Sequence, residues 1–454
     1  MTNLNTICAI ATPRGMGGVA MIRVSGADCF SIVGKIVSVN IASLEPRKMY
    51  NCDIGTLDKT MIAKFAAPNS FTGEDCIELY IHGGIALQNA VLNELFRAGA
   101  ALAEPGEFTH RAFINGKLDL VEAEAIGNII HAQTENALSA ASSGVAGLLS
   151  DKIKAIRSGL ITIVASLFVD MDFEEDSGFR IQDLGFSISG LQELIATADN
   201  GIIASQGLNV AIVGAPNVGK SSLLNALLGE DRAIVTDIAG TTRDIIHAQA
   251  NINGHLVNFI DTAGIRDTDD KIEQIGIERA RDAMAKADLV LFVVDDSSHS
   301  SVGGDAHIAP RDARDGVPYE LLHQPTSVGG AVPGAPAAQA PCIVVRNKCD
   351  TQNKNIPCDI EISAKTGFGI EKLCKKITAA CQEIPPNIPI IANHRQKNQI
   401  AHAASHLQSI NESTPLDSMV TAIEAAISAL SETIGENVSD EIISEIFSKF
   451  CVGK

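Results

Sequence analysis

The spacing of apolar residues changes twice along the chain, and each spacing predicts a different kind of structure. Over residues 1–116, short β-rich runs alternate with glycine-rich turns, as in Thr6–Ile10, Gly18–Val24 and Cys76–Ile81. A helical spacing follows over Ala86–Ala98. Short strands with such a helix predict a small N-terminal α/β domain over residues 1–116.

A second spacing begins near Leu118. From there to about Asp172 apolar residues recur every three or four positions without an intervening proline, which predicts long helices. The helical spacing returns over Leu191–Ser205 and again after Pro385-Pro386. We therefore expect a helical domain in two halves, residues 117–206 and 384–454.

Between these halves, residues 207–383 contain short, continuously apolar runs that predict buried strands. One segment of this region, Ser297–Pro341, is rich in Gly, Pro, Ala, Ser and His and has almost no apolar periodicity. A loop of this length and composition is either disordered or a functional lid, and the composition favours disorder. The strand-like runs are Leu208–Val213, Leu256–Ile260, Leu289–Val294 and Ile343–Val345.

The first of these strands leads into a phosphate-binding motif. Gly214-Ala-Pro-Asn-Val-Gly-Lys-Ser221 matches G-x-x-x-x-G-K-[ST] and precedes a helical run, Ser221–Leu228. This arrangement directs backbone N–H groups and a helix N-terminus at phosphates. We expect Lys220 to bridge the β- and γ-phosphates and the Ser221 hydroxyl to hold Mg²⁺. The predicted nucleotide contacts of this motif are Asn217, Val218, Gly219, Lys220, Ser221 and Ser222.

Two later segments are placed to sense the γ-phosphate. Thr236–Asp244 is rich in hydroxyl groups, and Thr242 is the predicted second Mg²⁺ ligand. Asp261 opens an Asp-Thr-Ala-Gly turn and is expected to hold the water shell of the metal, while the Gly264 N–H contacts the γ-phosphate. The predicted contacts from both segments are Thr236, Asp237, Ile238, Ala239, Gly240, Thr241, Thr242, Asp261, Thr262, Ala263 and Gly264.

Two short motifs predict that the base is guanine. In Asn347-Lys-Cys-Asp350 the Asp350 carboxylate can accept from the N1–H and 2-amino group of guanine, a pair that adenine does not offer. Lys348 can lie across the ring. In Ser363-Ala-Lys365 the Ala364 N–H can donate to O6. Four motifs in this order predict a doubly wound P-loop GTPase domain, inserted into the helical domain, so the fold class is multidomain α/β plus α.

The position after Gly264 is informative because it is apolar. Small GTPases usually place a glutamine there to orient water, whereas this chain has Ile265. The catalytic polar group must therefore come from elsewhere. Sequence spacing alone leaves the nearby polar residues open as candidates: Arg266, Asp267, Asp269, Asp270 and Glu273.

Composition narrows the partners and the compartment. The chain has 454 residues, is 46% hydrophobic and has a formal net charge of −19, which argues against nucleic-acid binding through its overall field. Ten cysteines without zinc spacing predict reduced thiols in a cytoplasmic protein. The most apolar stretch, Leu160–Val169, is too short to cross a membrane.

Across nearly its whole length the sequence resembles the bacterial tRNA-modification GTPase family MnmE, also called TrmE. The most diagnostic match is the terminal Cys-Val-Gly-Lys. The matching segments are Thr12–Gly18, Phe71–Asp75, His82–Gly84, Pro105–Phe108, Lys117–Leu120, Asp237–Asp244, Ile275–Arg279 and Cys451–Lys454.

The resemblance implies an N-terminal folate-binding domain that forms a homodimer, and a flavoprotein partner of the MnmG (GidA) family that contains FAD. With this partner the family installs an aminomethyl-type group on C5 of the wobble uridine of certain tRNAs. The one-carbon donor is a tetrahydrofolate derivative, of the 5-formyl or 5,10-methylene type.

The resemblance also assigns roles to residues. It implies that K⁺ takes the place of an arginine finger and that Glu273, together with Lys220, is catalytic, with Glu273 acting on the attacking water. The implied K⁺ ligands are Asn217, Thr236, Ile238 and Thr241. The implied folate contacts are Arg23, Glu78, Lys117 and Lys454, and Cys451 is functional in an unassigned role.

Two other functions remain open from the sequence. A ribosome-assembly GTPase of the Era or Der kind is disfavoured by a single P-loop and by the absence of a basic RNA-binding segment after Pro386. A folate-dependent transferase with a purely regulatory G domain would transfer the one-carbon unit as the isolated chain. The acidic balance predicts that the flavoprotein supplies much of the tRNA affinity.

Overall fold

A computed structural model describes most of the chain, and it divides into two compact units. The described residues are 5–13, 15–173, 180–215, 217–234, 248–261, 283–295, 340–351, 357–379, 381, 384–385 and 387–453. The first unit comprises residues 1–130, 143–195 and 395–454, and the second comprises residues 131–142 and 196–394.

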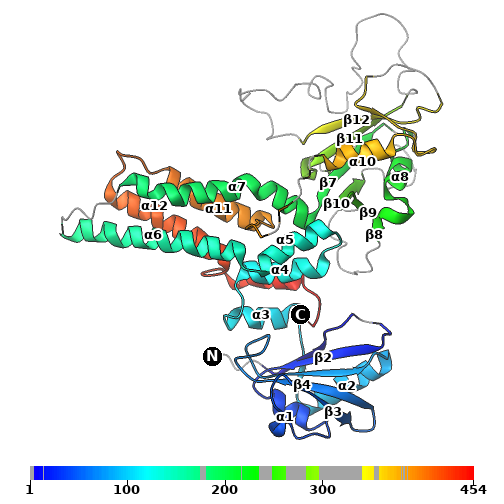
Figure 1. The fold of residues 1–454 in the computed structure, drawn as a ribbon, viewed down its shortest axis with the longest axis vertical. Helices are drawn as coiled ribbons and strands as arrows, with labels where there is room; N and C mark the ends of the chain where they lie inside the picture. The colour runs from blue at the N-terminus through cyan, green and yellow to red at the C-terminus, as the bar shows by residue number, and fades with distance from the viewer. Residues whose placement is uncertain are drawn as a thin grey trace, which may run out of the picture. The chain divides into compact units, whose positions relative to one another are not determined.

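The N-terminal part of the first unit is built on a six-stranded sheet in the order β3-β4-β5-β2-β1-β6 (Figure 1). Its neighbouring strands are antiparallel except for the parallel pair β1 and β6. The strands are β1 (Ile7–Ile10), β2 (Val19–Ser25), β3 (Met49–Ile54), β4 (Asp58–Phe65), β5 (Cys76–His82) and β6 (Ala101–Leu102).

One face of this sheet packs against two helices, α1 (Cys29–Gly34) and α2 (Ile85–Ala98). The core between them includes Ile22 of β2, Leu79 of β5 and Leu95 of α2, all fully buried. Because side chains alternate along a strand, Arg23, Glu78 and Tyr80 lie on the opposite face. This alternation places two of the four predicted folate contacts, Arg23 and Glu78, together on the face that α1 and α2 do not cover.

The rest of the first unit is helical. It contains α3 (Glu107–Ile114), α4 (Leu120–His131), α6 (Leu148–Phe173), α11 (His394–Gln408), α12 (Leu416–Ile434) and α13 (Asp440–Ser448), with a short 3₁₀ turn at Ile181–Leu184; another 3₁₀ turn, Ile41–Ser43, lies between α1 and β3 in the sheet part. Residues far apart in sequence meet here, since α6 packs along α12. Arg395 of α11 forms a two-point ion pair with Glu124 of α4, at 2.9 and 2.8 Å.

The second unit is built on a seven-stranded sheet in the order β13-β12-β11-β7-β10-β9-β8. Strands β13 to β10 run parallel, and β9 and β8 are antiparallel additions at one edge. The strands are β7 (Leu208–Gly214), β8 (Ala233–Ile234), β9 (Ala248–Ile252), β10 (His255–Asp261), β11 (Leu289–Val294), β12 (Cys342–Arg346) and β13 (Ile360–Glu361).

Apolar side chains bury both faces of this sheet. On one face Val210 and Ile212 of β7 pack with α8 (Lys220–Arg232) and α10 (Ile370–Thr378). On the other face Ala211 and Val213 of β7 pack with Ala283. A parallel sheet buried on both faces reads as a continuous apolar run, and this explains the run Val210–Val213.

The helices α5 (Glu135–Val145) and α7 (Gly185–Gln206) cross the limits of the compact units. The unit limits therefore do not coincide with residues 116, 206 and 383, and the division into four segments stays a prediction. Of Ser297–Pro341, all but the last two residues lie outside the described part. No helix among the described residues has both the length and the apolarity that a membrane crossing requires.

Candidate functional site

The phosphate-binding motif forms a loop between β7 and α8. Gly219 precedes the helix in the left-handed region, at φ 94°, and Asn217 has φ 65°. The Lys220 ammonium donates to the carbonyls of Gly214 (2.8 Å) and Ala215 (2.9 Å). These two hydrogen bonds hold the Lys220 side chain against the start of its own loop. Ser221 and Ser222 lie in the first turn of α8, where the free backbone N–H groups of a helix are found.

Asn347 joins this loop to the two base-selecting motifs. Its side chain, buried at the end of β12, donates from Nδ2 to the Val218 carbonyl over 3.0 Å. Its Oδ1 accepts from the Ala364 N–H at 3.1 Å. The Asn347 side-chain amide therefore holds the phosphate loop and the Ser363–Lys365 turn at a fixed distance from each other. A guanine nucleotide that spans both would require such a fixed distance.

Lys348 makes a second connection across the same site. It has φ 61°, and its Nζ donates to the Asn217 carbonyl and to Asp295 Oδ2, both at 2.7 Å. Asp295 follows β11 and is 1% exposed. The sequence prediction did not include Asp295, although an acidic residue directly after the buried run Leu289–Val294 was a usable signal.

Asp350 is exposed and available as an acceptor. A hydrogen bond with the Ser363 hydroxyl is the main cause that lowers the pKa of Asp350, and the charge of Lys365 acts in the same direction. The carboxyl is therefore ionised at neutral pH, the form that accepts two donors from guanine.

Several predicted residues lie outside the described part of the chain: Thr236, Asp237, Ile238, Ala239, Gly240, Thr241, Thr242, Thr262, Ala263, Gly264, Lys454, and Glu273 with its alternatives Arg266, Asp267, Asp269 and Asp270. Only the backbone of Asp261 is described. It ends β10 in register with Ile212, two residues before Gly214, so its backbone lies at the same sheet edge as the phosphate loop.

The donor chemistry of this edge fits Mg²⁺. The ion prefers oxygen ligands and shares them with substrate phosphates, and the Ser221 hydroxyl lies beside Lys220 at the start of α8. Of the four implied K⁺ ligands, the described part of the chain includes only Asn217.

A second polar cluster lies in the N-terminal domain. Arg23 and Glu78 stand opposite each other on β2 and β5. Both guanidinium donors of Arg23 reach one oxygen, with Nη2 at 2.9 Å and Nε at 3.2 Å from Glu78 Oε1. The guanidinium lies over the rings of Phe71 (4.9 Å) and Phe108 (5.7 Å).

The other oxygen of Glu78 has a different donor. The Tyr80 hydroxyl donates to Glu78 Oε2 at 2.6 Å. Burial, followed by this hydrogen bond, raises the pKa of Tyr80 to about 12, so the phenol stays protonated as a donor. The sequence prediction included neither Tyr80 nor the two phenylalanines. Tyr80 lies two residues after Glu78 on one strand, which was a usable local signal. The contacts of Phe71 and Phe108 with Arg23 instead follow only from the tertiary structure.

The chain end lies against the same domain. Val452 pairs with Pro105 and packs in an apolar cluster that includes Phe71 and Phe108. Gly453 has φ 100°, and a Cβ there would lie 2.2 Å from the Ile10 carbonyl oxygen. The tail thus places exposed Cys451 beside the domain that carries Arg23 and Glu78.

Lys117, the third implied folate contact, lies near the loop between β4 and β5. Its Nζ donates to the Pro68 carbonyl at 3.1 Å. The same loop is fixed by Arg111, buried on α3, which forms ion pairs with Glu74 (3.2 Å) and Glu107 (2.7 Å). Lys117 thus lies on a part of the surface that this hydrogen bond and these ion pairs hold in place.

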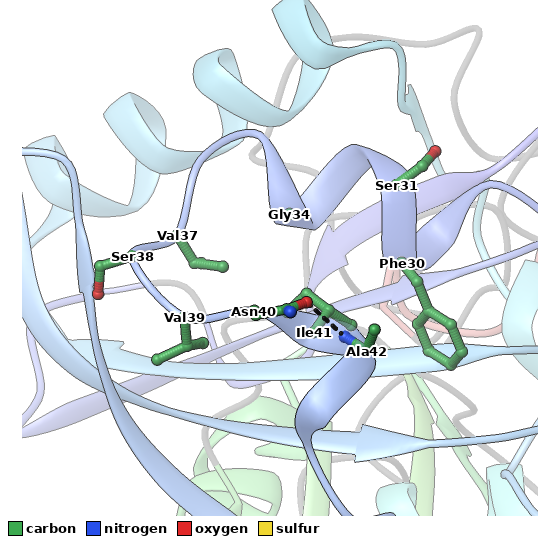
Figure 2. Close-up of a pocket in the computed structure, with 9 residues that line it drawn as sticks. All are labelled: Phe30, Ser31, Gly34, Val37, Ser38, Val39, Asn40, Ile41 and Ala42. Carbon is green, nitrogen blue, oxygen red and sulfur yellow. Dashed lines mark hydrogen bonds between the residues drawn. The ribbon is translucent and has the colours of Figure 1, made fainter.

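A separate cavity of about 580 Å³ lies between α1 and the 3₁₀ turn Ile41–Ser43 (Figure 2). Figure 2 shows apolar side chains and the local bond from the Ala42 N–H to Asn40 Oδ1, at 3.0 Å. None of the predicted site residues lines this cavity.

Comparison with known proteins gives two matching family models, each for one part of the chain. The profile of the MnmE helical domain matches residues 120–451, and that of the GTP-binding protein TrmE N-terminus matches residues 6–117. The chain is 41% identical to the tRNA modification GTPase MnmE of Dichelobacter nodosus over 416 residues, covering 89% of this chain and 88% of the relative. It is 37% identical to that of Thermotoga maritima, covering 99% of this chain and 100% of the relative.

Solved structures match part of the chain, with low TM-scores. Era from Aquifex aeolicus bound to GDP and AlF₄⁻ is 28% identical, with a TM-score of 0.26 over 46% of this chain and 69% of that chain. The G domain of the Thermotoga maritima FeoB iron transporter is 25% identical, with a TM-score of 0.23 over 38% of this chain and 99% of that chain.

Proposed function

Because the chain belongs to the MnmE family of tRNA modification GTPases, we propose a specific cycle for it. It is a GTP hydrolase that acts in tRNA modification. In the proposed cycle K⁺ stimulates hydrolysis, and a flavoprotein partner of the MnmG (GidA) family joins it to modify C5 of the wobble uridine of certain tRNAs. A tetrahydrofolate derivative supplies the one-carbon unit.

The observation that supports guanine nucleotide binding most is the pair of bonds made by Asn347. This side chain holds Val218 of the phosphate loop and Ala364 of the base loop, at 3.0 and 3.1 Å. The loops are therefore pre-organised before ligand arrives, which lowers the entropy cost of binding. Lys348 adds a third tie, through the Asn217 carbonyl.

In the proposed site the chain's own groups bind and orient the nucleotide. Lys220 leaves its two loop carbonyls to meet the β- and γ-phosphates, and the first-turn N–H groups of α8 donate to the phosphates. Asp350 accepts from the guanine edge. Ser221 and Thr242 would hold Mg²⁺, which neutralises charge that develops on the phosphates.

Hydrolysis is proposed to rely on Glu273, which orients or deprotonates the attacking water. Asn217, Thr236, Ile238 and Thr241 are proposed to hold K⁺, whose positive charge supplies what an arginine finger supplies in other GTPases.

The N-terminal domain is proposed to bind the folate between Arg23, Glu78, Lys117 and Lys454. The Glu78 carboxylate can accept N–H groups of a pterin ring, and the cations can meet the carboxylates of the ligand tail. The docked tail supports this assignment, because Gly453, the residue before Lys454 in the sequence, lies against Ile10 of this domain. The domain is also proposed to form the homodimer.

Nucleoside analysis tests the function as a whole. The chain, the flavoprotein partner, GTP, Mg²⁺, K⁺, 5,10-methylenetetrahydrofolate, an ammonium salt as the nitrogen source of the aminomethyl group, and unmodified tRNA are incubated, and the digested tRNA is measured by mass spectrometry. A modified wobble uridine that requires both proteins is expected. Transfer by this chain alone, or a tRNA unchanged by the complete mixture, would contradict the proposal.

A variant separates hydrolysis from binding. Glu273→Ala is expected to bind GTP as the wild type does, to lose hydrolysis and to stop modification. Retained hydrolysis would assign the catalytic role to a neighbouring polar residue.

A further inference from the structure

The Glu78 carboxylate is held at both of its oxygens, by two different residues. Arg23 donates twice to Oε1, and Tyr80 donates once to Oε2. Arginine and a carboxylate commonly pair through two oxygens. Here the pairing is restricted to one oxygen, and the hydroxyl of Tyr80 occupies the other.

The position of Tyr80 follows from strand geometry. It lies two residues after Glu78 on β5 and therefore on the same face of the sheet. Its register neighbours are Met21 on β2 and Met61 on β4, so apolar side chains flank the phenol ring. The hydroxyl reaches back along the strand to Glu78 Oε2, at 2.6 Å.

A carboxylate that has one fixed oxygen keeps rotational freedom. The last torsion of a glutamate is broad, because it joins an sp³ carbon to an sp² carbon. Without the Tyr80 bond, Glu78 is free to rotate until Arg23 bonds both oxygens, and this rotation changes the direction of the remaining lone pairs. The Tyr80 hydroxyl prevents it.

We propose that Tyr80 is a positioning residue of the ligand site, which holds the Glu78 carboxylate in the orientation that receives the N–H edge of a pterin-type ring. This role rests on the proposed folate site. Tyr80 itself acts through Glu78 and makes no contact with the ligand. The residue therefore sets how well the ring part of the ligand is recognised.

Burial and chemistry both suit this role. The side chains of Arg23 and Glu78 are each 12% exposed, so their mutual orientation is protected from competition by bulk water. The raised pKa of Tyr80 keeps its proton on the phenol through the physiological range. The donor is thus present at every pH at which the protein works.

The test compares two variants, each of which removes the hydroxyl group of one tyrosine. Tyr80→Phe removes the hydroxyl that holds Glu78. Tyr50→Phe is the matched control. Tyr50 lies on strand β3, and its hydroxyl accepts from the exposed backbone N–H of Glu45 at 3.1 Å. Binding of (6S)-5-formyltetrahydrofolate to the full-length chain is measured by calorimetry for both variants.

Tyr80→Phe is expected to weaken binding about tenfold, the effect of one hydrogen bond to a charged group, and Tyr50→Phe to leave it unchanged. Equal affinity of Tyr80→Phe and wild type would overturn the proposal while the folate site stands. A wild-type chain that binds no folate would instead remove the proposed folate site.

A spectroscopic measurement separates positioning from a general structural role. The chain has three tyrosines, so ¹³Cζ-labelled tyrosine gives a small set of signals, and Tyr80→Phe identifies one of them. Ligand binding at Glu78 is expected to shift that signal, because the carboxylate that accepts from Tyr80 then also accepts from the ligand and shares its charge between them. A signal that stays fixed while the ligand is bound would overturn the role of Tyr80.

Discussion

The side-chain amide of Asn347 donates to the Val218 carbonyl over 3.0 Å, across 129 residues of sequence. This bond connects the motif that selects the base to the loop that binds phosphate. A change on either side of the bond should therefore affect nucleotide binding, and the first two predictions concern these two sides.

Asp350→Asn should weaken GTP binding and favour xanthosine triphosphate. The carboxylate accepts from two guanine donors, and hydrogen bonds to a charged group contribute about 1.5–3 kcal/mol each, so we expect at least a hundredfold loss for GTP. Xanthine carries a carbonyl where guanine carries its amino group and thus suits an amide donor. Competition binding measures this. Glu371→Gln, an equal charge change at an exposed position of α10, should have no effect; equal losses in both variants would contradict the base-reading role.

Gly219→Ala should impair the phosphate loop. Gly219 has φ 94°, and a Cβ would lie 2.3 Å from Asn347 Nδ2, so backbone strain of about 1–3 kcal/mol adds to a direct clash. GTP affinity should fall at least tenfold in equilibrium titration. Gly159→Ala on α6 is the control, because its Cβ meets nothing within 4 Å, and it should stabilise the chain by about 0.5–1 kcal/mol. Unchanged GTP binding by Gly219→Ala would count against the loop geometry.

Arg395→Ala should destabilise the helical part of the chain. Arg395 pairs with Glu124 through both oxygens and also donates to the carbonyls of Glu432 and Thr433 at the end of α12. Glu124 is 10% exposed and would keep only the donor of Gln396 Nε2, at 2.6 Å, so the loss of its cation should cost about 1–3 kcal/mol. Urea unfolding followed by circular dichroism should show an earlier transition.

The exposed pair Lys449–Glu445 provides the comparison for Arg395. Both side chains are 72% exposed, so Lys449→Ala should change the unfolding midpoint little. Equal shifts for the two variants would show that burial does not set the strength of the Arg395 pair.

Thiol labelling should distinguish Cys451 from the buried cysteines. Burial raises the pKa of Cys8 and of Cys76 to about 12. At pH 8 such a thiol is about one part in 10⁴ thiolate, and the thiolate is the form that reacts. Exposed Cys451 should therefore account for the fast phase of iodoacetamide labelling. A fast phase that survives Cys451→Ser would contradict this order of reactivity.

Much of the fold was predictable because its signals are local. The buried run Leu208–Val213 and the helix after it became β7 and α8, and Ala86–Ala98 became α2. The strands β8 and β13 have two residues each. Such short edges carry too few residues for a periodic pattern, and the sequence did not predict them.

The site was less predictable wherever it depends on which strands are neighbours. The motifs identified Asn347 and Lys220 directly, because residue type and spacing there are dictated by the nucleotide. The Tyr80–Glu78 bond, between residues two apart on one strand, was missed although their shared face was a local signal. The Asp295–Lys348 pair was missed because it depends on which strands are neighbours. Residues 295 and 348 lie 53 positions apart, and a contact of this kind follows from the sheet order rather than from any local pattern.

The most direct test of the central claim is the steady-state rate of nucleotide hydrolysis in KCl and in NaCl at equal ionic strength, with GTP and with ATP. The account predicts turnover of GTP that is markedly faster in KCl, and little turnover of ATP in either salt. Equal rates in the two salts, or a preference for ATP, would contradict it.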